Sequence, residues 1–189
     1  HRNLVIDNKF FDQLIIENRG APVDNLAISL TVGCDYRDIF EVRGTKRKKR
    51  GITLKPLILK ESDAVKYAYT GLDDLTMATL VESLKSGRAP DKLQKNQFFW
   101  NLDLKTGEKK VIEMAVTPGI KGDFKPTLRS TSQAISDANE KYRNWLDSIA
   151  TITTGNDNLN KVLNVSTRDL YILQQPSGEY TGIAAGLPW

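Results

Sequence analysis

Adjacent carboxylates are the first residues in this sequence whose types and spacing could do chemistry. Asp73 and Asp74 stand side by side after Gly71. Hydrolysis by acid–base catalysis needs two carboxyl groups close together, one protonated near neutral pH and the other ionised. The sequence holds 23 acidic residues, however, so some pairs lie close by chance. Since this pair follows a glycine, we interpret it as part of a turn and do not expect it to be catalytic.

A second charged group is formed by Asp38, Glu41 and Arg43. Asp38 and Arg43 bracket the segment IFEV, which contains Glu41. If this stretch is extended, alternation points Ile39 and Glu41 to one side and the intervening residues to the other. Asp38 or Arg43 could then reach across a boundary to a neighbouring domain. The alternative is a local ion pair that shapes the end of a strand, worth about 0–1 kcal/mol if exposed. We favour this structural interpretation.

Five consecutive cations follow at residues 46–50, between Gly44 and Gly51. The chain carries 27 Lys and Arg against 23 Asp and Glu, a net charge of +4. Without these five cations, 22 basic residues face 23 acidic ones, so the basic character is local. Like charges in a row repel, which favours a solvated loop. Nucleic-acid binding would require aromatic platforms or widely spread phosphate contacts, and the run contains no aromatic residue.

The scarcity of cysteine and histidine excludes several classes of site. Cys34 and His1 are the sole examples of their types, so an internal disulfide, a Cys/His zinc site and a Ser-His-Asp triad are not expected. We predict no metal and no cofactor. No apolar run approaches the ~18 residues of a membrane span, and no signal-peptide pattern opens the chain. We therefore expect a cytoplasmic protein without a membrane partner.

Alternating apolar residues predict strands over the first two-thirds of the chain. In NLAISLTVGCDY, every second residue from Leu26 to Val32 is large and apolar, as in a half-buried antiparallel strand. The connection RGAPVD before it predicts a hairpin with the preceding strand, and Pro56 predicts an edge position or bulge. Trp100 is expected in the core. Further strands are expected at 52–60, 64–70, 75–83, 97–104 and 109–117, with polar loops at 84–96 and 118–129. The predicted fold is mainly β, an antiparallel β-sandwich.

The pattern changes to helical spacing from residue 130. Ser130 with Gln133 fits a capping box, and a second helix is expected from about Asp157. Trp145 falls on the apolar face of the first helix, so we expect it to be a core residue. The chain is thus divided into a sandwich domain, 1–129, and a helical connector, 130–189. The abrupt start at HRNLVID leaves open that part of the sandwich precedes residue 1.

Three stretches resemble the N-terminal β-sandwich domain of glycogen debranching enzymes of the amylo-α-1,6-glucosidase type. They are, in order, FDQLIIENRGAPVDNLAISLTVGCDYRDIFEVRG, its continuation into TKRKKRG, and TITTGNDNLNKVLNVSTRDLYILQQPSGEYTGIAAGLPW. The resemblance implies a sandwich of the large type associated with sugar enzymes, the supersandwich. It also implies a catalytic barrel of paired helices in the same polypeptide, beyond Trp189, as the partner. The family's catalytic carboxylates lie in that barrel.

The resemblance implies a non-catalytic domain that supports hydrolysis of α-1,6-linked glucosyl branches and meets α-glucan through the parent enzyme. The candidate cleft or interface residues are Asp38, Arg43, Pro188 and Trp189, the last two at the junction with the expected barrel. Two alternatives stay open. A stand-alone glycan-binding module would need exposed aromatic residues on one sheet face, and a nucleic-acid-binding domain would use residues 46–50.

Overall fold

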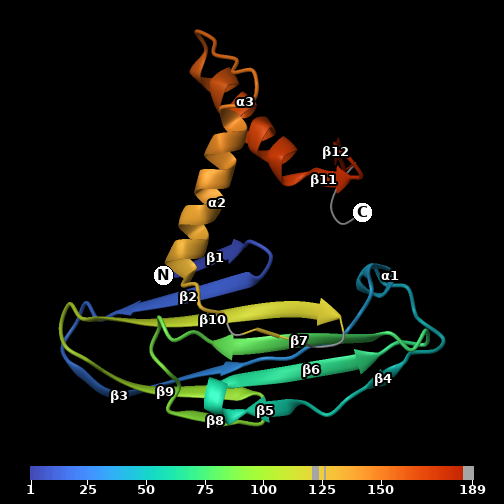
Figure 1. Cartoon of the computed structure of the whole chain (residues 1–189). Coiled ribbons are helices and arrows are strands. Elements are labelled where there is room, and N and C mark those ends of the chain that lie inside the picture. The colour runs from blue at the N-terminus through green and yellow to red at the C-terminus, as the bar shows by residue number, and fades with distance from the viewer. Residues whose placement is uncertain (121–123, 126, 185–189) are drawn as a thin grey trace. The chain divides into compact units, whose positions relative to one another are not determined.

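The computed structural model describes residues 1–120, 124–125 and 127–184. The chain divides into two compact units, His1–Ile135 and Ser136–Trp189. The first unit is an antiparallel β-sandwich, and helices follow it in the sequence (Figure 1). The predicted mainly β fold is therefore confirmed. The boundary expected between 129 and 130 stays a prediction.

Two antiparallel sheets of unequal size build the sandwich (Figure 1). The larger, seven-stranded sheet has the order β1-β2-β10-β7-β6-β4, with β5 also paired to β6. The smaller sheet has the order β3-β9-β8. The strands of the larger sheet are β1 Arg2–Ile6, β2 Phe10–Glu17, β4 Ile52–Thr53, β5 Leu57–Leu59, β6 Ala64–Thr70, β7 Thr76–Ser83 and β10 Lys109–Ile120. Those of the smaller sheet are β3 Val23–Thr31, β8 Lys92–Gln94 and β9 Gln97–Leu104.

The sandwich core lies between the two sheets and is built from inward-facing residues of both. Trp100 is 1% exposed, stacks with Phe98 at 6.1 Å between ring centroids, and donates its indole N–H to the Arg88 carbonyl at 2.9 Å. The prediction that Trp100 is a core residue is confirmed. The other buried members of the cluster are Val65, Tyr67, Val81, Leu102, Leu104, Ile112 and Met114.

The predicted hairpin between β2 and β3 is wrong, because the two strands belong to different sheets. Both edges of β2 are already occupied by β1 and β10, so the chain crosses to the other sheet after Glu17. The turn at 105–108 crosses back, with Gly107 at φ +77°. Asn18 joins the two crossings, since its side-chain amide donates to the carbonyls of Ala21 and Leu104 at 2.8 and 3.0 Å.

Other strand predictions were confirmed or corrected by their position in the sheets. The run 52–60 is split at Pro56 into β4 and β5, which lie at the sheet edge, as expected. The sequence reasoning missed β1, and it missed β8 inside the expected polar loop 84–96. Cys34, which follows β3, is partly buried, with Sγ 3.6 Å from Thr79 Oγ1.

Both predicted helices are present, α2 at Thr131–Leu146 and α3 at Asp157–Ile172. Ser130 Oγ accepts from the Gln133 backbone N–H at 3.1 Å, and Asn156 caps α3. The chain then forms a short hairpin of β11, Gln174–Ser177, and β12, Tyr180–Ile183, which the sequence reasoning missed. Among the described residues, no helix is both long and apolar enough to cross a membrane.

The prediction that Trp145 is a core residue is wrong. Its side chain is only partly buried and packs in an aromatic group with Tyr142 and Tyr171, at ring-centroid distances of 6.2 and 5.2 Å. Helical spacing identified the apolar face correctly, and Trp145 uses it for contacts with neighbouring aromatic residues without becoming fully buried.

Candidate functional site

A one-turn helix, α1 at Ile39–Val42, replaces the extended segment predicted for IFEV. The Asp38 side chain accepts from the Glu41 backbone N–H at 2.8 Å, and Glu41 Oε2 accepts from the Asp38 N–H at 3.1 Å. This is a reciprocal capping box, which satisfies two free donors at a helix start. The D-x-x-E spacing was the local signal for it, and the alternation argument for these residues was wrong.

An acid–arginine cluster forms around α1, and we define it as Asp35, Asp38, Glu41, Arg37, Arg47 and Arg50. Arg47 is bonded to Asp38 and lies 3.9 Å from Glu41, while Arg50 lies 3.5 Å from Glu41. Arg50 also donates to the Asp35 and Tyr36 carbonyls at 2.7 and 3.1 Å. Glu41 is only 8% exposed, so its carboxylate is largely desolvated. The guanidinium groups of Arg47 and Arg50 compensate its charge.

The cation run is therefore more structured than the predicted solvated loop. Arg47 and Arg50 fold back onto the acidic residues before them, which local charge counting could not show. Lys46, Lys48 and Lys49 are exposed. The loop thus keeps three of its cations toward solvent and uses two to fasten itself to α1.

The two glycines that bracket this loop have distinct structural roles. Gly44 has φ +98°, a backbone conformation that residues with a side chain rarely adopt. At Gly51 a Cβ atom would lie 1.9 Å from the Thr70 carbonyl oxygen, so the loop returns against the β6 end with no room for a side chain. The Gly51 N–H also donates to the Tyr69 hydroxyl at 2.7 Å. Both loop ends are therefore fixed.

An aromatic pair, Tyr36 and Tyr69, packs against the acid–arginine cluster. Tyr36 stacks on Tyr69 at 5.4 Å, and the Arg50 guanidinium lies 5.9 Å from the Tyr69 ring centroid. Tyr36 has φ +50°, which is uncommon for a bulky residue, so the stacking holds it in a strained backbone conformation. Burial raises the pKa of Tyr36 to about 12. Burial also raises the pKa of Tyr67.

Several large apolar side chains near the cluster are exposed. Figure 1 shows α1, β4 and the turn between β6 and β7 at one end of the sandwich. We call the exposed apolar residues Phe40, Val42, Ile52 and Leu72 of these segments the loop-end surface. A shallow depression of about 710 Å³ lies between Leu72 and the cations Arg47, Lys48 and Lys49. Exposed apolar groups rimmed by charge are typical of an interaction surface.

The sequence-predicted site residues are only partly brought together. Asp38 caps α1 and binds Arg47, and Arg43 ends the helix with its N–H donated to the Ile39 carbonyl at 3.0 Å. Asp38 and Arg43 therefore lie at the two ends of one helical turn. Pro188 and Trp189 lie outside the described residues.

The adjacent carboxylates Asp73 and Asp74 form a turn, as predicted. Asp74 has φ +59° and donates its N–H to the Gly71 carbonyl at 3.2 Å, and Asp73 Oδ1 accepts from the Leu75 N–H at 3.1 Å. The Asp73 side chain is thus used to close the turn, which is a structural role.

Two buried carboxylates were not singled out from the sequence. Glu113 is 2% exposed and accepts from Gln13 at 2.8 Å and from Ser86, while Glu82 is 5% exposed and accepts from Thr127. Glu113 lies between apolar residues of β10 and Glu82 follows Val81 on β7, and no local sequence signal marks either of them. Within the described ranges, no three His, Cys, Asp or Glu residues are grouped so as to hold a metal ion.

The raised pKa of Tyr36 predicts a loss of stability at high pH. The neutral phenol is favoured in the folded state, so this contribution is complete below the unfolded pKa of ~10 and is lost as pH rises from there toward about 12. We expect the Tyr36→Phe variant to lose less stability than the wild type over this range, measured by urea unfolding. Tyr180→Phe, at an exposed tyrosine, is the control. Parallel pH profiles for wild type and Tyr36→Phe would contradict the prediction.

Comparison with known proteins gives one family match. The family model described as the N-terminal domain of (some) glycogen debranching enzymes matches residues 1–115. No curated protein matches the chain. A solved chain described as "Putative kojibiose phosphorylase from human microbiome" matches with 14% sequence identity and a TM-score of 0.40, and covers 88% of this chain and 20% of that chain. This chain therefore spans about a fifth of the length of that protein. Because the family model covers more than half of the 189 residues, the chain belongs to the family of N-terminal domains of glycogen debranching enzymes.

Proposed function

We propose that this chain is a non-catalytic domain that supports hydrolysis of α-1,6-glucosidic branches by a separate helical-barrel domain of the same polypeptide. Its contact with α-glucan is then made through the parent enzyme. Family membership supports the parent activity. The observation that carries the proposal is the loop-end surface, where Phe40, Ile52 and Leu72 are 57%, 68% and 66% exposed beside a fixed, charged loop. Such side chains gain most from burial against another protein surface.

The acid–arginine cluster has a defined part in this function. It holds α1 and the cation run in one conformation, so the loop-end surface is preorganised before contact. We propose that this end of the sandwich rests on the barrel and forms one wall of the substrate cleft. Asp38, Arg43, Pro188 and Trp189 remain the candidate contact residues. Interfaces between domains of one chain typically bury ~600–1,500 Å².

The alternatives make less use of the observed geometry. A glycan-binding module would need several exposed rings on one sheet face. On the outward face of β9, Phe99 is partly buried and has Lys92 Nζ 6.0 Å from its centroid. Titration with maltodextrin tests this alternative, since a supporting domain should give no heat. A nucleic-acid binder would need its arginines free, but Arg47 and Arg50 are paired with carboxylates.

A cytoplasmic location remains part of this proposal.

The proposed contact is tested by introducing a charge on the loop-end surface. In the complete enzyme, we expect Leu72→Asp to lower kcat/KM for branch hydrolysis about tenfold, equivalent to roughly 1.4 kcal/mol of transition-state stabilisation. The side chain is largely exposed, so folding of the sandwich should be unaffected. Leu128→Asp, at an even more exposed leucine of the same unit, is the matched control. Wild-type kcat/KM for Leu72→Asp would reject the contact.

A further inference from the structure

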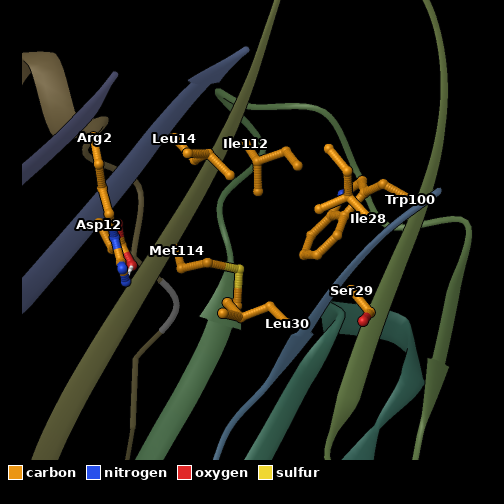
Figure 2. Close-up of a pocket in the computed structure, with 9 residues that line it drawn as sticks. All are labelled: Arg2, Asp12, Leu14, Ile28, Ser29, Leu30, Trp100, Ile112 and Met114. Carbon is orange, nitrogen blue, oxygen red and sulfur yellow. Dashed lines mark hydrogen bonds and ion pairs between the residues drawn. The ribbon is translucent and has the colours of Figure 1, made fainter. Parts of the chain in front are cut away.

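The side chains of β2 alternate between the inner face of the larger sheet and its outer face. Asp12 and Leu14 line an opening of about 100 Å³ on the inner face, which Trp100 also lines (Figure 2). Phe11 and Gln13 point the other way, because successive side chains of a strand lie on opposite faces. Both are nevertheless buried, at 1% and 7% exposed. Another part of the chain must therefore cover the outer face.

The first turn of α2 supplies part of this cover. Ala134 of α2 forms a second apolar cluster with Phe11, Leu84 and Ala115. Ala134 and Thr131 are both 0% exposed. The compact unit that contains the sandwich ends at residue 135, so this turn belongs to it. The start of α2 is therefore packed on the outer face of the larger sheet.

Apolar packing contributes little to this attachment. The stabilisation gained by burial grows with the apolar area removed from water, and the one side chain that α2 gives to the apolar cluster is the single methyl group of Ala134. The Gln13 side-chain amide lies 3.4 Å from Ser132 Oγ, which is a long hydrogen bond. Polar contacts of the segment before α2 must therefore provide much of the attachment.

The turn between β1 and β2 makes two such contacts. Lys9 Nζ donates to Thr127 Oγ1 at 2.6 Å. The Arg129 guanidinium donates to the Asp7 carboxylate at 2.8 Å and to the Asp7 carbonyl at 3.2 Å. It also lies 5.1 Å from the ring centroid of Phe11, a residue of the apolar cluster under α2. We call Asp7, Lys9, Thr127 and Arg129 the latch.

The spacing of the latch residues is the same in both segments. One exposed residue separates the two latch residues of each segment: Asn8 in the turn, and Leu128, which is 94% exposed, in the segment before α2. Asn8 has φ +58°, a backbone conformation that asparagine adopts more readily than most residues. Alternate side chains of the turn thus meet alternate side chains of the other segment, and the residues between them face solvent.

The latch contacts are shielded from water to different extents on their two sides. The Asp7 side chain is 10% exposed and that of Arg129 is 29% exposed. Thr127 donates its hydroxyl, and its backbone N–H at 3.3 Å, to the carboxylate of Glu82, which is 5% exposed. Hydrogen bonds to charged groups are stronger than neutral ones, and these are less weakened by solvent than an exposed ion pair. The latch is therefore suited to hold a segment that has little apolar contact.

We propose that the β1–β2 turn fixes the start of α2 on the sandwich through the latch, and that the latch opens while the sandwich stays folded. The core cluster between the two sheets contains no latch residue, so its packing does not depend on the latch. Regions with few buried apolar contacts open at a lower free energy than core strands. The first hairpin of the chain therefore controls the point from which α2 leaves the sandwich.

Hydrogen exchange in the complete protein tests the latch. The amides of Gln133 and Ala134 report on the first turn of α2, since both are bonded to Ser130. Arg129→Met keeps an aliphatic side chain over Phe11 but removes the charge that binds the turn. We expect exchange of these two amides to become about tenfold faster, because the turn opens locally more often, while the amides of β9 in the sandwich core keep their wild-type rates.

Three further variants make the test specific. Lys9→Met removes the other contact of the latch and should accelerate the same amides. Asp7→Asn removes the partner of Arg129, so the double variant with Arg129→Met should exchange no faster than the faster single variant. Leu128→Ala, at the exposed residue between Thr127 and Arg129, is the matched control and should keep wild-type rates.

Two results would overturn the proposal. Wild-type exchange of Gln133 and Ala134 in both Arg129→Met and Lys9→Met shows that the latch does not hold α2. Acceleration of the β9 amides by the same factor as those of α2 shows that the segment opens only when the whole sandwich unfolds.

Discussion

Trp100→Ala is expected to lower the free energy of unfolding by about 3–5 kcal/mol, the usual cost of removing a large buried aromatic side chain. The indole is 1% exposed, stacks on Phe98, and lies between the two sheets. Its loss leaves a cavity next to an opening of about 100 Å³ that the same side chain lines. The surroundings are therefore poorly placed to collapse into the space.

Two variants separate the causes of this loss. Trp100→Phe keeps an aromatic ring but removes the N–H donated to the Arg88 carbonyl, so we expect a smaller cost of about 1–3 kcal/mol. Phe99→Ala, one residue away on the opposite face of β9, is the control and should cost less than Trp100→Ala. Unfolding is followed by far-ultraviolet circular dichroism in urea. A loss below about 1 kcal/mol for Trp100→Ala would contradict the assigned core.

Strands with one buried face were predictable from the sequence, because side chains alternate between the faces of a sheet. For β3 and β9 the large apolar residues recur at every second position, and the structure turns those residues inward. The partner of a strand was not predictable by the same reasoning. The wrong hairpin between β2 and β3 shows this. One edge of β2 pairs with β1, its neighbour in sequence, and the other edge pairs with the distant strand β10.

The candidate site divides in a similar way between local and distant contacts. The turn at Asp73 and Asp74 follows from neighbouring residues, and it was predicted correctly. The capping box of Asp38 and Glu41 is also local, but the short apolar run between the two was interpreted with the period of a strand. The return of Arg47 and Arg50 to the acidic residues depends on where Gly51 meets β6. This contact joins distant parts of the chain, so the periodicity of the sequence could not predict it.

Glu41→Ala is expected to release the cation run from α1. Glu41 accepts from the Asp38 N–H and lies within 4 Å of both Arg47 and Arg50, so its loss removes the capping box and leaves two guanidinium groups without a carboxylate they now share. We expect the free energy of unfolding to fall by about 1–3 kcal/mol, as for the loss of hydrogen bonds to a buried charged group. Tryptic cleavage within residues 46–50 should become faster, because the loop opens locally more often.

Matched variants distinguish the helix cap from the ion pairs. Glu41→Gln can still reach the Asp38 N–H, since glutamine serves in a capping box, but it carries no charge for Arg47 and Arg50. Asp38→Asn keeps a good helix cap and removes only the charge that faces Arg47. If the ion pairs fasten the loop, both variants accelerate cleavage while stability falls less than in Glu41→Ala. Glu61→Ala, at an exposed carboxylate on a separate turn, controls for the change in net charge. Wild-type cleavage rates in Glu41→Gln and Asp38→Asn would show that the cap alone orders the loop, and the loop-end surface would then owe its conformation to α1.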